Sequence, residues 1–519
     1  MTTALPGNAT VAVIGAGAMG AGIAQTAALA GHPVQLHDTR FGAADAAKAG
    51  IADALARVVA KGKLPAAEAD AALNRIATVV TLPDACTAAL VVEAIVEDLA
   101  AKRELFARLE HIVAPACILA SNTSSLSITA LGTGLSHPAR VVGMHFFNPV
   151  PLMPLVEVVS GLATDPEVAA RIFATAAAWG KTPVHAASTP GFIVNRCARP
   201  FYGEALRLLH EGAAAPATID AILREAGGFR MGPFELMDLI GHDVNYAVTQ
   251  SVWEAFYHDP RYTPSARQRE LVAAGFLGRK SGRGFYAYGP GTALPPPQTE
   301  APGPRPVRVV VHGDAGGAPA RVAPLVARLD AAGVAVERAP ADARFGSGAL
   351  QVVGPAGDAW LVPTDGRTAT ARAALAGVRD LIVFDLALDY AKATRLAVAC
   401  ADGSSDAAAA AATGALQAAG LAVSRIDDCP GLVVLRTVAM LANEAADALV
   451  QGVADAAAVD LAMVKGVSYP RGPLAWADAI GVAALRDALA HLGAHYGDGR
   501  YRVSPLIARR ALTGRPLHG

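Results

Sequence analysis

The sequence predicts a Rossmann-type α/β domain, an all-α domain, a degenerate Rossmann-like α/β segment and a second copy of the all-α domain. Three observations predict this arrangement. A strand, a glycine-rich turn, a helix and a second strand follow one another in residues 9–38. β-rich runs alternate with helical stretches up to about residue 186. The sequence around Pro190 then recurs around Pro430, which indicates that a domain was duplicated.

The first strand leads into a turn with the glycine spacing of a dinucleotide site. Val11–Ile14 is followed by Gly15, Gly17 and Gly20. The first glycine allows the tight turn, the second lets the backbone approach a pyrophosphate, and the third lets helix and strand pack closely. The pyrophosphate then lies at the helix N-terminus, where free N–H groups favour anions. The candidate contacts are Gly15, Gly17, Ala18, Met19 and Gly20.

The second strand, Val34–His37, is followed by an acidic residue, Asp38. An acid at this spacing after the glycines is expected to bind the adenosine ribose hydroxyls. The acid favours NAD over NADP, although Arg40 leaves a contact to a 2′-phosphate open. We therefore expect NAD as the cofactor.

Later β-rich runs extend the predicted parallel sheet, and the repeat defines the rest of the chain. The runs are Leu90–Ala94, Cys117–Ala120 and Arg140–Met144. Pro190-Gly-Phe-Ile-Val-Asn-Arg aligns with Pro430-Gly-Leu-Val-Val-Leu-Arg, and the second copy is expected to lack the Gly278–Tyr286 tail. The predicted segments are a Rossmann domain (1–186), a helical domain (187–289), a proline-rich linker (290–306), a degenerate α/β segment (307–426) and a second helical domain (427–519).

The degenerate segment is predicted to have lost its nucleotide. A strand at Val307–Val311 and a helix near Pro324–Ala332 resemble the start of the first domain. His312-Gly-Asp-Ala-Gly-Gly replaces the glycine fingerprint, and no acidic residue closes the second strand at the right point.

Composition excludes several classes of protein. The chain has 519 residues, 53% of them hydrophobic, and a net charge of −1, so it has no basic surface for nucleic acid. Five cysteines without paired spacing argue against disulfides or a zinc site and fit a reducing cytosol. The apolar N-terminus lacks the basic region of a signal peptide. We expect a cytoplasmic protein without a membrane segment or a metal.

Two segments at predicted strand ends carry candidate chemistry. Ser121-Asn-Thr-Ser-Ser follows one strand and His145-Phe-Phe-Asn-Pro follows another, and open α/β sheets bind ligands at such ends. Glu157 lies inside an apolar run, where a carboxylate needs a partner. His145 is the obvious partner, and the pair would make a general base. Asn195 is polar in the first helical copy but Leu435 in the second, so the fold does not require it.

Taken in order, these motifs resemble the L-3-hydroxyacyl-CoA dehydrogenases, in the long bacterial form with a duplicated C-terminal domain. The resemblance spans residues 10 to about 288 and extends to the C-terminus through the second helical copy. It rests on the glycine fingerprint, Val92-Glu-Ala-Ile-Val-Glu, Ser121-Asn-Thr-Ser-Ser-Leu, His145-Phe-Phe-Asn-Pro-Val-Pro, Met153-Pro-Leu-Val-Glu, Pro190-Gly-Phe-Ile-Val-Asn-Arg, Gly232-Pro-Phe-Glu-Leu-Met-Asp and Lys280-Ser-Gly-Arg-Gly-Phe-Tyr.

The resemblance implies a role for each matching residue. His145 would take the proton of the 3-hydroxyl, and Glu157 would orient it. Ser124 and Asn195 would hydrogen-bond the reacting oxygen. The other implied residues are Asn148 in the substrate loop, Asp38 at the ribose, Glu97, Lys102 and Asn122 along the cofactor groove, and Lys61 at the coenzyme A phosphates. Ala54 stands where some relatives carry a serine, which leaves the coenzyme A contacts open.

Several alternatives remain at this point. Another β-hydroxyacid dehydrogenase would often use a lysine as its acid/base, and a non-catalytic relative would be expected to lose members of the catalytic set. The acyl group could be short or dicarboxylic, with Arg196, Arg199 and Arg230 as candidates near its tail. The second helical copy has no second His-Phe-Phe-Asn-Pro, so we expect one active site per chain. The two helical copies would pair within one chain, or the chain would form a homodimer.

Overall fold

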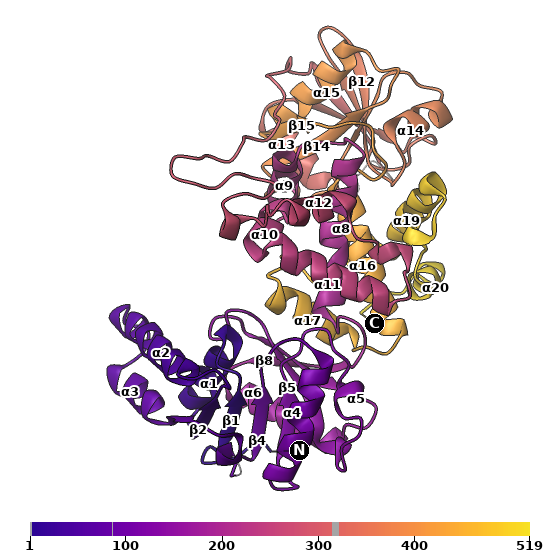
Figure 1. Cartoon of the computed structure of the whole chain (residues 1–519). Coiled ribbons are helices and arrows are strands. Elements are labelled where there is room, and N and C mark those ends of the chain that lie inside the picture. The colour runs from indigo at the N-terminus through magenta and orange to yellow at the C-terminus, as the bar shows by residue number, and fades with distance from the viewer. Residues whose placement is uncertain (1–2, 86, 314–320, 519) are drawn as a thin grey trace. The chain divides into compact units, whose positions relative to one another are not determined.

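The computed structural model describes residues 3–85, 87–313 and 321–518, and the chain divides into two compact units (Figure 1). One unit contains residues 1–196 and 451–467, and the other contains residues 197–450 and 468–519. Cys86 and most of the predicted His312-Gly-Asp-Ala-Gly-Gly turn lie outside the described residues. Among the helices of the described ranges, none combines the length and apolar character that crossing a bilayer requires.

The first unit is built on an eight-stranded sheet. Its order is β3 (Ile76–Val79), β2 (Val34–His37), β1 (Val11–Ile14), β4 (Leu90–Glu93), β5 (Ile118–Ser121), β6 (Val141–Phe146), β7 (Leu155–Ser160) and β8 (Thr182–Ala187). β1, β4 and β5 are buried along their whole length because helices cover both faces, which is why they read as continuous apolar runs. The predicted sheet was fully parallel, but β7 pairs antiparallel to β6. The chain turns back after β6 through a short loop that leaves no room for a crossover helix.

Among the described residues, seven helices belong to this first unit. They are α1 (Ala18–Leu29), α2 (Ala43–Ala60), α3 (Ala66–Asn74), α4 (Leu99–Ile112), α5 (Ile128–Leu131), α6 (Pro166–Ala178) and α17 (Ala456–Gly466). α1, α2 and α3 pack on one another beside β1 and β2, at the indigo end of the chain in Figure 1. Small residues on α1, such as Gly20 and Ala24, are buried and let it lie close to the sheet.

The second unit contains a seven-stranded sheet. Its order is β10 (Ala335–Pro340), β9 (Arg308–Gly313), β11 (Leu350–Val353), β12 (Asp358–Pro363), β13 (Leu381–Phe384), β14 (Arg395–Cys400) and β15 (Ala422–Arg425), with helices α13 (Ala323–Ala331), α14 (Ala369–Ala376) and α15 (Asp406–Ala418). β9 and β10 pair in parallel as β1 and β2 do, but β11 runs antiparallel to both of its neighbours. The sheet is therefore a reduced Rossmann-type sheet, with no counterpart of β3 among the strands that the structure describes.

An acidic residue lies close to the second strand of this segment, although not at the equivalent point. Asp342 comes two positions after the end of β10, whereas Asp38 directly follows β2. The segment Asp342-Ala-Arg-Phe-Gly repeats Asp38-Thr-Arg-Phe-Gly of the first unit. The backbone repeats as well, since Gly42 and Gly346 have φ angles of 74° and 72°. The aspartate is one residue farther from the end of β10 than Asp38 is from the end of β2, so a search at the same spacing does not find the repeat.

The two helical copies pack on one another inside the second unit. The first copy begins with α7 (Val194–Cys197), most of which belongs to the first unit. It continues in the second unit with α8 (Arg199–His210), α9 (Pro216–Glu225), α10 (Pro233–Ile240), α11 (His242–Ala255) and α12 (Ala266–Ala273), and the second copy contributes α16 (Val434–Val450), α18 (Pro473–Ile480), α19 (Val482–Tyr496) and α20 (Pro505–Thr513). α8 lies against α16. Tyr262 donates from the first copy to Glu444 (2.5 Å), and Tyr501 donates from the second copy to Glu204 (2.8 Å). The contact between the copies is therefore reciprocal.

One helix of the second copy belongs to the first unit. α17 packs on β7 and β8, and the amide of Ala187 donates to the carbonyl of Val453 (2.8 Å). Its counterpart α9 packs on β14 of the second sheet, where Asp427 N–H donates to the carbonyl of Ala213 (3.0 Å). Each α/β sheet is thus covered by a helix from the other copy of the repeat.

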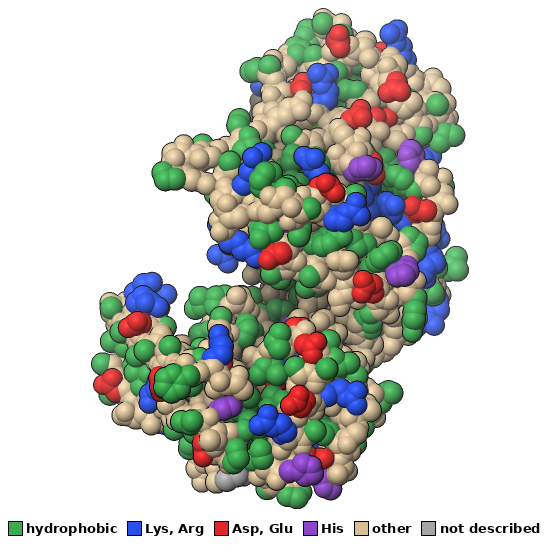
Figure 2. Space-filling model, in the orientation of Figure 1, with side chains coloured by type: hydrophobic (Ala, Val, Ile, Leu, Met, Phe, Trp, Pro, Cys, Tyr) green, Lys and Arg blue, Asp and Glu red, His purple; other side chains and the backbone are tan. Residues whose placement is uncertain are grey.

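The linker and the C-terminus are more ordered than the sequence suggests. The linker lies alongside β15, because the amide of Glu300 donates to the carbonyl of Val423 (2.8 Å). The second copy has no sequence like the Gly278–Tyr286 tail, but two amides near residue 517 bind the equivalent aspartate. Asp478 accepts from the amides of Leu517 (2.6 Å) and His518 (3.2 Å), much as Asp238 accepts from two amides of the first tail. On the face shown in Figure 2, basic and acidic side chains are interspersed.

Candidate active site

The glycine turn after β1 has the geometry that its spacing predicts. Gly15 has a φ of 106°, and a Cβ atom there would lie 2.4 Å from the carbonyl oxygen of Ala94. A Cβ at Gly20 would lie 1.7 Å from the carbonyl oxygen of Gly15. Gly17, which caps α1, faces open space, because a Cβ added there would meet no atom within 4 Å. The turn therefore leaves the N-terminus of α1 accessible to a pyrophosphate, so the residues fit a bound dinucleotide.

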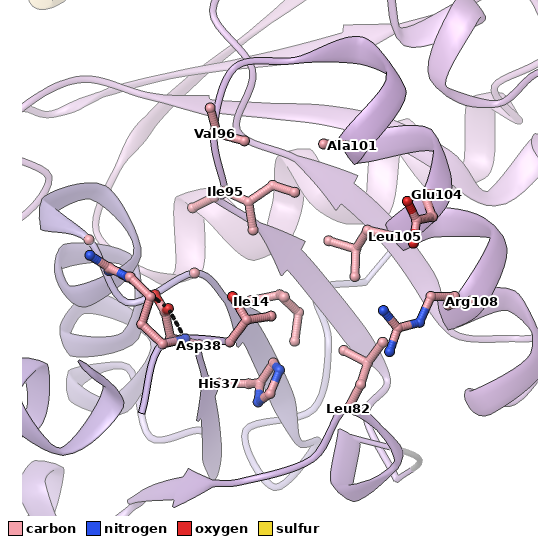
Figure 3. Close-up of a pocket in the computed structure, with 15 residues that line it drawn as sticks. Ile14, His37, Asp38, Leu82, Ile95, Val96, Ala101, Glu104, Leu105 and Arg108 are labelled. Atoms are coloured by element: carbon pink, nitrogen blue, oxygen red, sulfur yellow. Dashed lines mark hydrogen bonds and ion pairs between the residues drawn. The ribbon is translucent and has the colours of Figure 1, made fainter. Parts of the chain in front are cut away.

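A cavity of about 500 Å³ opens at the carboxyl end of this part of the sheet (Figure 3). Asp38 and Arg108 lie on opposite sides of it in Figure 3, with apolar side chains between them. The apolar walls are Ile14, Leu82, Ile95, Val96 and Leu105. An apolar slot bounded by a carboxylate suits an adenosine, which has a flat base and a ribose diol. Sequence reasoning found Asp38 but not the apolar walls, because single apolar residues in loops carry no recognisable pattern.

Asp38 is held by its neighbours through both carboxylate oxygens. Oδ2 accepts from the amide of Ala16 (2.8 Å) and from the Arg40 guanidinium (3.0 Å). Oδ1 accepts from the Arg40 amide (2.9 Å) and from Arg40 Nε (3.0 Å). The hydrogen bonds and charge of Arg40, with the amide of Ala16, hold the pKa of Asp38 well below its usual range against the opposing effect of burial. Asp38 is therefore a carboxylate, which accepts hydrogen bonds only.

His145 and Glu157 form a buried pair. The antiparallel register of β6 and β7 places the two residues directly opposite one another, so their side chains share one face. His145 Nδ1 lies 2.6 Å from Glu157 Oε2. The other carboxylate oxygen accepts from the amides of Ile193 (2.9 Å) and Val194 (3.0 Å) at the start of the helical region. Three partners satisfy the fully buried Glu157 and fix the orientation of the imidazole.

The position of His145 differs in one respect from the prediction. The sequence placed it in a loop after a strand ending at Met144, but β6 continues to Phe146. The rings of Phe147 and Phe192 pack near the imidazole, with centroids at 4.5 and 5.8 Å. The histidine is therefore held on a strand rather than on a flexible loop.

Asn195 and Ser124 meet next to this pair. Asn195 Nδ2 donates to the backbone carbonyl of Ser124 (3.2 Å). Because Asn195 directly follows the two amides bound by Glu157, the histidine pair and the serine loop are connected through one short helix. Asn122 accepts from the amide of Phe146 (2.8 Å), so it fixes the end of β6 next to His145.

Comparisons with known proteins identify the family to which the chain belongs. A profile of the 3-hydroxyacyl-CoA dehydrogenase NAD binding domain matches residues 10–189. The profile of the C-terminal domain of the same family matches residues 191–288 and again residues 431–517. Residues 361–430 match the reduced Rossmann-fold domain of 3-hydroxybutyryl-CoA dehydrogenase. The chain belongs to the 3-hydroxyacyl-CoA dehydrogenase family. It is an NAD-dependent oxidoreductase of the long form with a repeated C-terminal domain.

Individual relatives show the same relationship. The chain is 43% identical over 503 residues to a 3-hydroxyadipyl-CoA dehydrogenase of Escherichia coli K12, covering 97% of both chains. It is 45% identical over 278 residues to a probable 3-hydroxybutyryl-CoA dehydrogenase of Bacillus subtilis, covering 54% of this chain and 96% of that one. A crystal structure of a 3-hydroxybutyryl-CoA dehydrogenase from Escherichia coli K12 superposes with a TM-score of 0.87 at 41% identity, covering 98% of this chain and 99% of that one.

In this member of the family, Glu97 organises the serine loop. Its Oε1 atom accepts from Thr123 Oγ1 (2.7 Å) and from the amides of Ser124 (2.9 Å) and Ser125 (3.2 Å). Burial alone would raise the pKa of Glu97, but the charge of Lys102 and these hydrogen bonds outweigh burial and lower it. The carboxylate of Glu97 therefore holds the backbone of Ser124 in place.

Lys102 is buried and carries two carboxylate partners. Its Nζ atom lies 2.6 Å from Glu93 Oε1 and 3.2 Å from Glu97 Oε2. Glu93 is fully buried and also accepts from Ser121 Oγ (2.6 Å). Sequence reasoning did not select Glu93, although an acid at the end of an apolar strand is the same signal that identified Glu157.

The other predicted residues lie farther from this network. Asn148 is exposed and precedes a cis peptide bond to Pro149. Lys61 is exposed just after α2, and its side chain makes no hydrogen bond or ion pair with any residue that the structure describes. Arg196 is buried and donates to Gln451 (2.9 Å), whereas Arg199 and Arg230 lie in the second unit. In the described ranges, no group of three or more His, Cys, Asp or Glu side chains is placed to hold a metal ion.

Proposed function

We propose that this enzyme oxidises an L-3-hydroxyacyl-CoA to the 3-oxoacyl-CoA, with His145 as the general base and Glu157 as the carboxylate that orients it. The observation that carries the proposal is the 2.6 Å contact between His145 Nδ1 and Glu157 Oε2 inside the sheet. Because Nδ1 is engaged by the carboxylate, Nε2 is the ring nitrogen left to accept a proton. When bound, NAD supplies the hydride acceptor.

The residues divide the work of the reaction. His145 takes the proton of the 3-hydroxyl as C3 loses its hydride, so the C–O single bond becomes a carbonyl. Glu157 stabilises the imidazolium that results, without leaving the amides of Ile193 and Val194. Ser124 and Asn195 are in contact and would bind the reacting oxygen. Their role is to align the substrate carbon and to stabilise charge on its oxygen.

The cofactor would be held by the glycine turn and by Asp38. Gly15, Gly17, Ala18, Met19 and Gly20 surround the N-terminus of α1, and Asp38 faces the adenosine cavity. Asn122, Glu97 and Lys102 support this groove from behind through the contacts described above. For Glu97 and Lys102 the geometry favours a positioning role over direct contact with the cofactor.

The coenzyme A portion has a separate hollow available to it. A second cavity of about 510 Å³ lies along α1 and α2 and includes Ala54 and Pro151. Small side chains line it, so an extended pantetheine chain would fit without a rearrangement. Lys61 follows the same helix and would meet the phosphates, while Asn148 would shape the loop near the thioester.

The names of the relatives leave two acyl classes open, short-chain and dicarboxylic. Both a 3-hydroxyadipyl-CoA and a 3-hydroxybutyryl-CoA dehydrogenase are similar along the whole chain. Arg196 is next to Asn195 but is buried against Gln451. A series of 3-oxoacyl-CoA substrates of both classes would establish the preference.

We also propose that the two helical copies replace a subunit contact within one chain. The reciprocal hydrogen bonds of Tyr262 and Tyr501 across the copies support this, as does the full-length match of single-copy relatives to half of the chain. In this proposal the sequence segments 187–289 and 427–519 are the two partners, with 307–426 as the degenerate second α/β domain. Cys117, Cys400 and Cys429 are free thiols, which supports a cytoplasmic location.

The reaction is tested by following NADH absorbance with acetoacetyl-CoA, in parallel with NADPH. We expect oxidation of NADH by the wild type and a loss of about 10²–10⁴ in kcat for His145→Ala. His312→Ala, a histidine in the degenerate segment, is the matched control and should keep full activity. Equal activity of His145→Ala and the wild type would refute the proposed base.

A further inference from the structure

The four hydrogen-bond positions of the Asp38 carboxylate are all filled by donors of the chain itself. A carboxylate has about four lone-pair positions, two on each oxygen. The amides of Ala16 and Arg40 take one position on each oxygen, and the Arg40 side chain takes the second position on each. A ribose diol needs two acceptor positions on this carboxylate. Only the two positions that the guanidinium occupies can be freed by rotation of a side chain, since the other two donors are backbone amides.

The arginine contact is a property of the local segment and not of the cofactor cavity. In the second sheet, Arg344 donates to Asp342 from its amide (2.8 Å), from Nε (3.0 Å) and from the guanidinium (2.8 Å). Those are the same three contacts that Arg40 makes with Asp38, in the repeated Asp-x-Arg-Phe-Gly segment. The arginine therefore closes on the aspartate whether or not a nucleotide site is present.

We propose that Arg40 determines cofactor choice: it covers the ribose-binding face of Asp38, must swing away when NAD binds, and is a latent receptor for the 2′-phosphate of NADP. The side chain is free to move, because 70% of it is exposed. In the wild type, the Asp38 carboxylate repels the 2′-phosphate of NADP. NADP also lacks the ribose 2′-hydroxyl that would donate to this carboxylate. Replacement of Asp38 by a neutral residue leaves the guanidinium free for bidentate phosphate binding.

The inference rests on the proposed NAD site, so it is tested by binding rather than by turnover. Isothermal titration with NAD and with NADP compares the wild type, Arg40→Ala, Asp38→Ser and the double variant. Arg40→Ala should bind NAD about threefold to tenfold more tightly, since a competitor for Asp38 is removed. Asp38→Ser should bind NADP about tenfold more tightly than the wild type, and the double variant should lose that gain.

Arg344→Ala is the matched control, because it opens the same local contact away from the cofactor cavity. It should leave both dissociation constants unchanged, and thermal unfolding checks that each variant is folded. Unchanged or weaker NAD binding by Arg40→Ala would overturn the displacement of Arg40. Equal NADP binding by Asp38→Ser and the double variant would overturn the latent phosphate site. A wild type that binds no NAD would refute the proposed function itself, which is a distinct result.

Discussion

The two α/β regions of the chain differ most at one pair of positions. In the first sheet, His145 on β6 faces Glu157 on β7. At the corresponding positions of the second sheet, Asp385 follows β13 and Ala397 lies on β14, joined by a backbone hydrogen bond of 3.0 Å. The position of His145 is thus an aspartate in the second region, and the position of Glu157 is an alanine.

This difference separates a structural requirement from a functional one. In both regions a buried carboxylate accepts amides at the start of the following helical copy. Glu157 does so with one oxygen and keeps the other for His145. Asp385 uses Oδ2 for the amides of Val433 and Val434 and Oδ1 for that of Leu435. The fold needs the carboxylate at the helix start, and the first region adds a histidine to it.

The largest effect is expected from neutralising these two carboxylates in turn. Glu157→Gln can no longer stabilise the imidazolium and can hold the wrong tautomer, so kcat should fall about 10²–10⁴-fold. Asp385→Asn is the matched variant, with the same burial and the same helix contact but no histidine. Steady-state kinetics should show its kcat within about twofold of the wild type. Similar losses of kcat in both variants would mean that the lost activity comes from a disturbed fold and not from the missing partner of His145.

The next effect concerns the buried charges around Lys102 in the first region. Lys102→Met leaves Glu93 and Glu97 without their cation, and the unpaired buried charge should cost about 3–5 kcal/mol of unfolding free energy. Urea unfolding of the wild type and the variant measures this. The double variant Lys102→Met with Glu93→Gln should recover part of the loss, because one of the uncompensated charges is removed.

A smaller effect follows from the pH dependence of Asp385. Burial, opposed by the backbone amides of Val434, Leu435 and their neighbours, raises the pKa of Asp385 to about 6. A raised pKa means that the folded state binds the proton more tightly than the unfolded state. The stability from this group is complete below the unfolded pKa of 3.8 and is lost as the pH rises through about 6. The shift corresponds to about 3 kcal/mol.

This pH dependence is measured as a difference. Between about pH 4 and pH 7, the stability of the wild type relative to Asp385→Asn should decrease as the pH rises. Thermal unfolding of the two proteins at a series of pH values gives the curve. A constant difference over this range would show that the carboxylate has an ordinary pKa despite its burial.

The smallest effect is expected at the repeated Asp-x-Arg-Phe-Gly segment of the second sheet. Arg344 is partly exposed and lies over the rings of Phe345 and Trp360, at 5.2 and 4.9 Å from their centroids. Arg344→Ala should cost about 1 kcal/mol or less in unfolding free energy, as surface ion pairs and exposed cation–π contacts usually do. A loss of several kcal/mol would show that this segment contributes more to stability than the equivalent segment of the first sheet. In that equivalent segment, the side chain of Phe41 is fully exposed.

Sequence reasoning predicted the elements whose signal is local. The strands Val11–Ile14 and Val34–His37 were predicted to the residue, because glycines and an acid mark their ends. The contact between His145 and Glu157 was predicted because a carboxylate in an apolar run needs a partner. The same argument applied to Glu93 would have found its contact with Lys102.

Features that depend on chain topology could not be predicted in this way. The antiparallel direction of β7 is fixed by a short turn that has no characteristic sequence. The Asp342 segment was missed because one extra residue changes its distance from the strand. The placement of α17 on β8 depends on where the chain travels between distant segments, and hydrophobic pattern alone does not contain this information.

The placement of α17 has a consequence for how the chain is made. β7 and β8 are complete early in synthesis, but the helix that packs on them is encoded more than half of the chain later. A ribosome adds about 5–20 residues per second, so this apolar surface waits uncovered for many seconds. During this interval the nascent N-terminal half exposes the surface of β7 and β8 that α17 covers in the complete chain.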